Sequence, residues 1–179
     1  MVVDGAKENG FGVYVGRFSP MHLGHQVLIK NLLTTYGERH LILVGSCNHL
    51  VSFRHLFTYQ DRCEFIRRVY PDVRLVGLPD FEENGDWFRQ LDDTLALAHI
   101  DPAHATFVGG CQEDISFFID SGRSVQIFNR FSGATPKVSA TEVRDALIEH
   151  RAFDHLVDAQ IVDLVQQRFG LRWATLRKK

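Results

Sequence analysis

Two histidines three residues apart flank a glycine near the N-terminus, in residues 16–25, which read GRFSPMHLGH. A short apolar run precedes this segment and an amphipathic run follows it, so we predict a strand-to-helix turn here. Glycines let a backbone approach a ligand closely, and the start of a helix offers unpaired N–H groups to an anion. His22 and His25 add side-chain donors, and Arg17 adds a fixed positive charge. This set of groups suits a polyphosphate.

A second polar segment, residues 138–144, reads VSATEVR. Ser139 followed three residues later by Glu142 is a capping-box spacing, so we expect a helix to begin here with Thr141 in its first turn and Arg144 one turn in. An ordinary capped helix explains the string equally well when it is taken alone.

Both segments resemble motifs of the nucleotidylyltransferase superfamily, the first its GRFxPxHxGH signature and the second its ISSTxxR element, with Ala140 in place of one serine. In that superfamily the hydroxyls and the arginine hold a triphosphate from the side opposite the histidines. The resemblance implies catalytic roles for His22, His25, Arg17 and Arg144. It implies an ATP-binding set of Gly16, Phe18, Gly24, Gly109, Ser139 and Thr141.

The middle of the chain resembles the nicotinamide mononucleotide adenylyltransferases of the archaeal type, which are also found fused to Nudix domains. The shared features are the GSCN turn at 45–48, the FTYQDR helix start at 57–62 and the PDFEENGDW segment at 79–87. The resemblance implies a mononucleotide site of Ser46, Asp80, Asn84 and Trp87, in which the indole stacks on the nicotinamide ring. The alternative for Trp87 is a core aromatic residue. Arg54 and His55 are either phosphate-reaching or simply solvated.

The implied reaction is adenylyl transfer from ATP to nicotinamide mononucleotide, giving NAD and pyrophosphate, with Mg²⁺ accompanying ATP and no protein metal site. One alternative is another phosphate acceptor: nicotinate mononucleotide, pantetheine phosphate or an alcohol phosphate. Another is a non-catalytic nucleotide-binding regulator, because Ala140, Cys111 and Glu113 depart from the family pattern.

Apolar runs alternate with helical patterns along the chain. We predict strands at 11–15, 40–45, 73–78, 106–108 and 124–128, and helices that begin near residues 27, 58, 87 and 139, with a helical tail at 154–169. This alternation predicts an α/β fold, a Rossmann-like doubly wound parallel sheet of about five strands. In such sheets ligands bind at the carboxyl ends of the strands, so the turns at 45–46, 79–80 and 109–110 should share one rim with the histidines.

The bulk composition restricts the class of protein. The 179 residues favour a single domain, 1–179, with a core of about 11–150 and a helical tail of about 151–179. A formal charge of −2 argues against nucleic acid or an anionic membrane as a partner, and the chain carries no apolar run of membrane-spanning length. Three distant cysteines and a polar N-terminus indicate a cytoplasmic protein, and homo-oligomerisation stays open.

Overall fold

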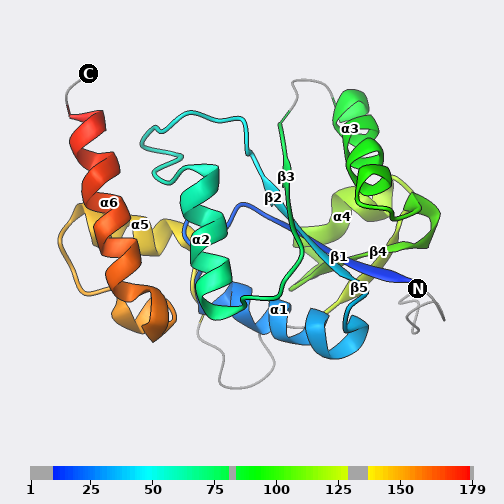
Figure 1. Cartoon of the computed structure of the whole chain (residues 1–179), viewed down its shortest axis with the longest axis horizontal. Coiled ribbons are helices and arrows are strands. Elements are labelled where there is room, and N and C mark those ends of the chain that lie inside the picture. Colours follow the sequence, from blue (N-terminus) through cyan, green and yellow to red (C-terminus); the bar gives the residue numbers. More distant parts are fainter. Residues whose placement is uncertain (1–9, 81–83, 129–136, 178–179) are drawn as a thin grey trace.

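A five-stranded parallel sheet forms the centre of the protein, seen in a computed structural model that describes residues 10–80, 84–128 and 137–177. The strand order is β3-β2-β1-β4-β5 (Figure 1). The strands are β1 (Phe11–Gly16), β2 (His40–Gly45), β3 (Leu75–Leu78), β4 (Ala105–Gly109) and β5 (Ser124–Ile127). The predicted Rossmann-like fold is confirmed.

Strand β1 is the central strand and pairs with β2 on one side and β4 on the other. Val13 lies opposite Leu41 of β2 and Phe107 of β4. The chain moves outward from β1 through β2 to β3, then crosses back to β4, so the strand order reverses between β1 and β4. Open α/β sheets bind ligands at the carboxyl ends of the strands beside such a reversal.

Helices cover both faces of the sheet (Figure 1). They are α1 (Leu23–Tyr36), α2 (Tyr59–Val69), α3 (Asn84–Leu97), α4 (Gln112–Asp120), α5 (Ala140–Ile148) and α6 (Val162–Leu176). Ile42 and Val44 of β2 belong to the core shared with α1, α2, α5 and α6, whereas Leu41 and Leu43 belong to the core shared with α3 and α4. Because successive side chains of a strand point to opposite faces, a sheet covered twice requires the continuous apolar run that β2 has.

Local signals set the helix boundaries correctly at two places. Thr58 caps α2, with its hydroxyl accepting from the Asp61 N–H at 3.1 Å while the Asp61 carboxylate accepts from the Thr58 N–H at 2.9 Å. Ser139 caps α5 by accepting from the Glu142 N–H at 3.1 Å. The capping spacings therefore predicted both helix starts.

The predicted helical tail at 154–169 is confirmed only in part, because the α-helix begins at Val162. Two 3-10 turns, Asp154–Leu156 and Ala159–Ile161, precede α6, and Val157 between them has an extended backbone. Asp158 stops a continuous helix because its carboxylate accepts from the Gln160 N–H at 2.9 Å and from the Gln26 amide at 2.7 Å. The Gln26 partner belongs to α1, so the tertiary contact decides the local structure.

Helix α6 then packs against α2 through an ion pair. Arg172 donates from Nε and Nη2 to the two carboxylate oxygens of buried Asp61, each at 2.8 Å, and Arg168 donates to Glu64 at 2.6 Å. Helix α4, to which the sequence analysis assigned no element, packs on β4 and β5. Among the described residues, no helix is both long enough and apolar enough to cross a membrane.

Candidate active site

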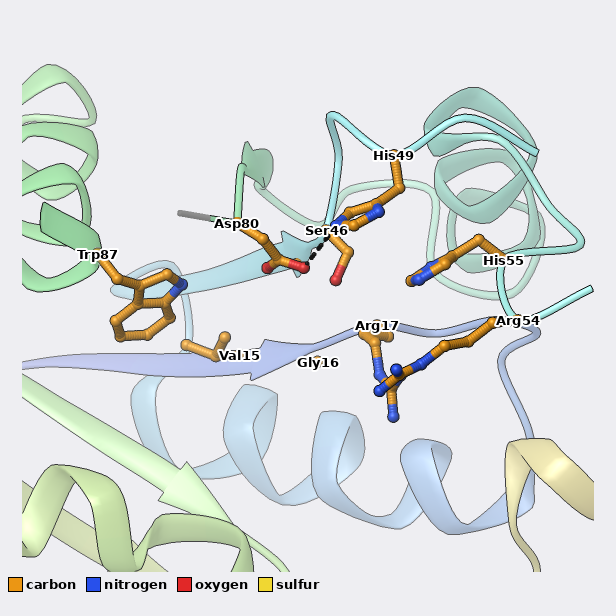
Figure 2. A pocket seen from close by; sticks show the side chains of 10 residues that line it. Val15, Gly16, Arg17, Ser46, His49, Arg54, His55, Asp80 and Trp87 are labelled. Atoms are coloured by element: carbon orange, nitrogen blue, oxygen red, sulfur yellow. Dashed lines mark ion pairs between the residues drawn. The ribbon is translucent and has the colours of Figure 1, made fainter. Parts of the chain in front are cut away.

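A cavity of about 500 Å³ opens at the carboxyl ends of β1, β2 and β3 (Figure 2). Its lining includes five residues that the sequence analysis selected, namely Gly16, Arg17, Ser46, Asp80 and Trp87. The other lining residues are Val15, Gly45, His49, Arg54 and His55. Trp87 stands at one end of the cavity, and Arg17, Arg54 and His55 stand at the other (Figure 2). The turns after three predicted strands therefore do meet at one rim.

The spacing of the two histidines has a direct geometric reason. His22 is the N-cap of α1, and its Nδ1 accepts the Gly24 N–H at 3.1 Å, while Nδ1 of His25 accepts the His22 N–H at 3.2 Å. The two imidazole centroids lie 3.7 Å apart. A Cβ on Gly24 would stand 3.0 Å from the His22 ring, so a glycine lets the ring fold back over the helix start. Because both Nδ1 atoms accept, each neutral ring carries its proton on Nε2.

Phe18 forms the floor beneath this turn. Its φ of +51° is in the left-handed region, and its side chain is fully buried. The Phe18 ring lies 4.8 Å from the His25 ring, and a Cβ on Gly16 would stand 2.9 Å from it. Gly16 is therefore needed where β1 ends, and Phe18 supports the His25 imidazole rather than lining the cavity.

The start of α5 lies beside the start of α1, although the two are far apart in sequence. Arg144 donates from Nη1 to the Ser19 carbonyl at 2.9 Å and from Nη2 to the Thr141 hydroxyl at 3.0 Å. Burial lowers the pKa of Arg144, and the positive charges of Arg17 and Arg54 lower it further. Arg17 and Arg54 therefore lie near enough to Arg144 for their charges to act on its guanidinium.

Arg62, to which the sequence assigned no role, holds together the segments that line the cavity. Its side chain is buried, and it donates to the carbonyls of Arg17 at 2.8 Å, Gly45 at 2.6 Å, Ser46 at 3.0 Å and Thr58 at 3.3 Å. One guanidinium thus ties the ends of β1 and β2 to the start of α2. Within the described residues no carboxylate forms an ion pair with Arg62. Burial lowers the pKa of its guanidinium, and the more distant charge of Asp80 partly offsets that effect.

The loop after β2 forms the opposite wall. Ser46 has a φ of +54° and is buried. The Asn48 amide holds the backbone of Asp80, donating to its carbonyl at 3.0 Å and accepting its N–H at 2.9 Å. His49 Nε2 lies 2.9 Å from the Asp80 carboxylate, the ion pair drawn in Figure 2. The GSCN turn and the Pro79–Asp80 turn are thereby joined.

Trp87 fits both of the roles that the sequence left open. It lines the cavity, and its indole also packs edge-on against Phe88 at 5.5 Å and Phe117 at 5.3 Å. Asn84 begins α3, but its side chain lies outside the described part of the chain. Gly109 ends β4 outside the cavity lining, where a Cβ would collide with the Ile115 side chain, so helix packing alone requires that glycine.

Comparison with known proteins gives one consistent result. The sequence profile of the cytidylyltransferase-like family matches residues 13–146. The chain is 30% identical over 169 residues to the nicotinamide-nucleotide adenylyltransferase of Saccharolobus solfataricus, covering 89% of this chain and 91% of that protein. It is 25% identical over 167 residues to the enzyme of the same name from Methanoculleus marisnigri, covering 89% of this chain and 92% of that one.

A solved structure shares the fold. The bifunctional NMN adenylyltransferase/ADP ribose pyrophosphatase of Francisella tularensis superposes with a TM-score of 0.69 at 19% identity. The match covers 90% of this chain and 53% of that protein, so the chain corresponds to about half of the bifunctional enzyme. Together with the sequence matches, this places the chain in the cytidylyltransferase-like family, among the relatives of the archaeal nicotinamide-nucleotide adenylyltransferases.

Proposed function

We propose that this protein transfers the adenylyl group of ATP to nicotinamide mononucleotide, forming NAD and releasing pyrophosphate. The observation that carries the proposal is the distribution of charge along one cavity. At one end Arg17 and Arg54 form no ion pair with a carboxylate among the described residues, and at the other end stands the indole of Trp87. A nucleotide has this same polarity, with phosphate at one end and a ring at the other. The names of the relatives support the choice of substrates.

His22 and His25 bind the ATP phosphates in this proposal. Their Nδ1 atoms are taken by backbone N–H groups, so each ring offers its proton from Nε2. The start of α1 adds the positive end of its helix dipole. The backbone-fixed orientation of both rings means that the donors need no rearrangement as phosphate binds.

Arg17 and Arg144 stabilise the charge that develops during transfer. Arg144 is held between the Ser19 carbonyl and the Thr141 hydroxyl, which fixes the plane of its guanidinium. A fixed planar fork suits two phosphate oxygens at once. The rest of the ATP-binding set consists of Gly16, Phe18, Gly24, Ser139 and Thr141, which shape or cap this region, and Gly109, which ends β4 and packs against α4.

The mononucleotide occupies the end of the cavity that Trp87 lines. Its cationic nicotinamide ring stacks on the indole face, which an electron-poor ring favours. Ser46 and Asp80 contribute polar groups from the turns after β2 and β3, and Asn84 completes the set.

The chemical step needs no general base. A phosphate oxygen of the mononucleotide, already ionised at neutral pH, attacks the α-phosphorus of ATP. A new P–O bond forms there, the bond to the α–β bridging oxygen breaks, and pyrophosphate departs with that electron pair. Catalysis then depends on alignment and on stabilising the oxygens that gain charge.

Mg²⁺ enters as part of the ATP substrate rather than as a resident ion. Within the described residues, no group of three or more histidine, cysteine, aspartate or glutamate side chains could hold a metal. Among the described residues, Asp80 is the single carboxylate that lines the cavity, and it pairs with His49. In this proposal phosphate oxygens and water hold most of the coordination positions of the metal.

Product analysis by mass spectrometry tests the proposal. The protein is incubated with ATP, Mg²⁺ and, in separate reactions, nicotinamide mononucleotide, nicotinate mononucleotide, pantetheine phosphate and glycerol phosphate. We expect NAD and pyrophosphate in equal amounts from the first reaction. A faster reaction with another acceptor would replace the substrate, and no pyrophosphate from any acceptor would identify a non-catalytic nucleotide-binding protein.

A further inference from the structure

Two histidines are stacked in the cavity wall beside the arginines. The His49 and His55 ring centroids lie 4.4 Å apart with their planes 13° from parallel. His49 is anchored by its Nε2 contact with the Asp80 carboxylate at 2.9 Å. Both rings line the cavity, and Figure 2 shows His55 on the side of Arg17 and Arg54. The pair is thus attached to β3 through Asp80 and reaches toward the cationic end.

The backbone of His55 is fixed by a tight turn. Its N–H donates to the Ser52 carbonyl at 3.0 Å and to the Ser52 hydroxyl at 3.2 Å, and its carbonyl accepts the Ser52 N–H at 3.1 Å. Across residues 10–80, 84–128 and 137–177, no group hydrogen-bonds the half-buried His55 imidazole. The ring is therefore positioned by stacking and by its backbone, while its nitrogens remain available to a ligand.

Positive groups approach His55 from each element around it. Arg54 and His49 belong to its own loop, Arg17 comes from the turn after β1, and Arg62 comes from α2. Burial lowers the pKa of His55 first, and the charges of these four groups lower it further. Asp80, the nearby carboxylate, contacts His49 instead. Burial and the neighbouring positive charges thus both favour the neutral form of the His55 imidazole.

We propose that His55 is a phosphate-binding residue of this cavity that takes up a proton as the phosphate enters, with the His49–Asp80 pair holding its ring in place. The proposal rests on the proposed function only in that the cavity takes a phosphorylated ligand. It adds a binding residue and a proton that travels with the ligand.

The sign of the effect follows from charge. A phosphate group offsets the guanidinium charges that oppose protonation, so His55 gains a proton and becomes a charged donor to a phosphate oxygen. Because the pKa of His55 rises on binding, affinity is highest at low pH. It falls as pH rises through the pKa of the bound state, and it levels off above that value.

Titration calorimetry with inorganic pyrophosphate measures the proton directly. Binding is followed near pH 6.5 in two buffers of different ionisation enthalpy, for wild type, His55→Asn and His104→Asn. His104 is a matched control because it pairs with Asp101 just before β4 begins. It therefore lies at the amino end of that strand, whereas the cavity lies at the carboxyl ends of the strands. Pyrophosphate's own titration is common to all three proteins and cancels in the comparison.

We expect wild type and His104→Asn to take up the same number of protons and His55→Asn to take up fewer. At about pH 6 His55→Asn should bind roughly tenfold more weakly than wild type, as expected for a lost hydrogen bond from a charged donor. The difference should shrink toward about pH 9, where the histidine is neutral in both states. Equal proton uptake and parallel pH curves for wild type and His55→Asn would overturn the proposal, as would an absence of pyrophosphate binding to wild type.

A measurement on the unaltered protein covers the case in which the variant is poorly folded. The ¹⁵N shifts of the His55 ring are followed against pH with and without pyrophosphate. A higher titration midpoint with pyrophosphate supports the proposal, and an unchanged midpoint contradicts it.

Two further experiments show which phosphate group causes the proton uptake. They also test the role of His55 separately from the proposed reaction. Repeating the calorimetry with nicotinamide mononucleotide and with nicotinamide riboside shows whether the acceptor phosphate takes the proton. The riboside lacks the phosphate, so it should cause no uptake that depends on His55. Uptake with pyrophosphate in a protein that makes no NAD would support the role of His55 and refute the proposed reaction. NAD synthesis without proton uptake that depends on His55 would support the proposed reaction and refute the role of His55.

Discussion

The turn between β1 and α1 and the loop between β2 and α2 both follow a buried strand, yet they are built in opposite ways. In the turn, Phe18, Ser19, Met21 and His22 are buried, and the histidines hydrogen-bond the backbone of the helix start. In the loop, residues 48–50 and 53–54 are exposed. The turn holds donors that the backbone fixes, whereas the loop carries charges on exposed side chains. We therefore expect substitutions in the turn to lower turnover more than substitutions in the loop.

His25→Ala should have the largest effect. We expect turnover to fall by about two orders of magnitude, since removing one preorganised donor costs about 3 kcal/mol in a transition state. Steady-state NAD formation measures the effect, and the thermal midpoint controls for loss of the His22 N–H contact with His25. Near-normal turnover in a folded His25→Ala protein would contradict the claim that the turn contributes more to catalysis than the loop.

Arg144→Lys should come next, with turnover lowered about tenfold although the charge is kept. A lysine cannot bridge the Ser19 carbonyl and the Thr141 hydroxyl and still present a planar fork to phosphate. The matched control is Arg151→Lys, an exposed arginine paired with Glu149. A change confined to the Michaelis constant for ATP would mean that Arg144 binds only the ground state.

Trp87→Ala should raise the Michaelis constant for the mononucleotide about tenfold and leave that for ATP unchanged, because ring stacking contributes roughly 1–3 kcal/mol. Trp87→Phe keeps an aromatic face and the contacts with Phe88 and Phe117, so its effect should be smaller. Separate titrations of the two substrates measure both constants. Weaker ATP binding would instead assign Trp87 to the adenine end or to the core.

Arg172→Met should have the smallest effect on turnover and a clear effect on stability. Asp61 is buried and keeps a longer contact with Arg168 at 3.6 Å, so loss of the two Arg172 hydrogen bonds should lower the free energy of unfolding by about 2 kcal/mol. Denaturant unfolding at neutral pH measures the loss. A proportionate fall in turnover at a temperature where the variant is folded would show that α6 acts on the site through α2.

The same ion pair predicts an acid sensitivity. Burial raises the pKa of Asp61, but hydrogen bonds from Arg172 and Thr58 outweigh burial and hold it below the ordinary value. The carboxylate therefore stabilises the fold above the ordinary aspartate pKa of about 3.9, and this stability is lost as pH falls through the lower, folded-state pKa. Arg172→Met should unfold at a higher pH than wild type in an acid titration followed by circular dichroism.

Much of the fold and part of the site could be predicted because the signals are local. Apolar runs marked the strands, capping spacings marked two helix starts, and the short spacing of His22, Gly24 and His25 is required by one ring folding over one glycine. Features set by distant partners could not be predicted. Asp158 breaks the tail helix through Gln26, and Arg62 is buried only because the ends of β1 and β2 bring carbonyls to it.

The stacking of His49 and His55 could not be predicted from the sequence either. His49 and His55 lie six residues apart in a loop with no periodic pattern, and His49 is held by Asp80 from the turn after β3. The sequence left His55, like Arg54, either in reach of a phosphate or simply solvated, and it indicated no role for His49. Nothing in the spacing of the two histidines indicated a pair.

Isotope tracing tests the central claim most directly. Nicotinamide mononucleotide carrying ¹⁸O at the three non-bridging phosphate oxygens is incubated with unlabelled ATP, Mg²⁺ and the protein, and the products are weighed by mass spectrometry. Attack on the α-phosphorus predicts NAD that retains all three labels together with unlabelled pyrophosphate. Labelled pyrophosphate, or no NAD from a folded protein that binds both nucleotides, would contradict adenylyl transfer.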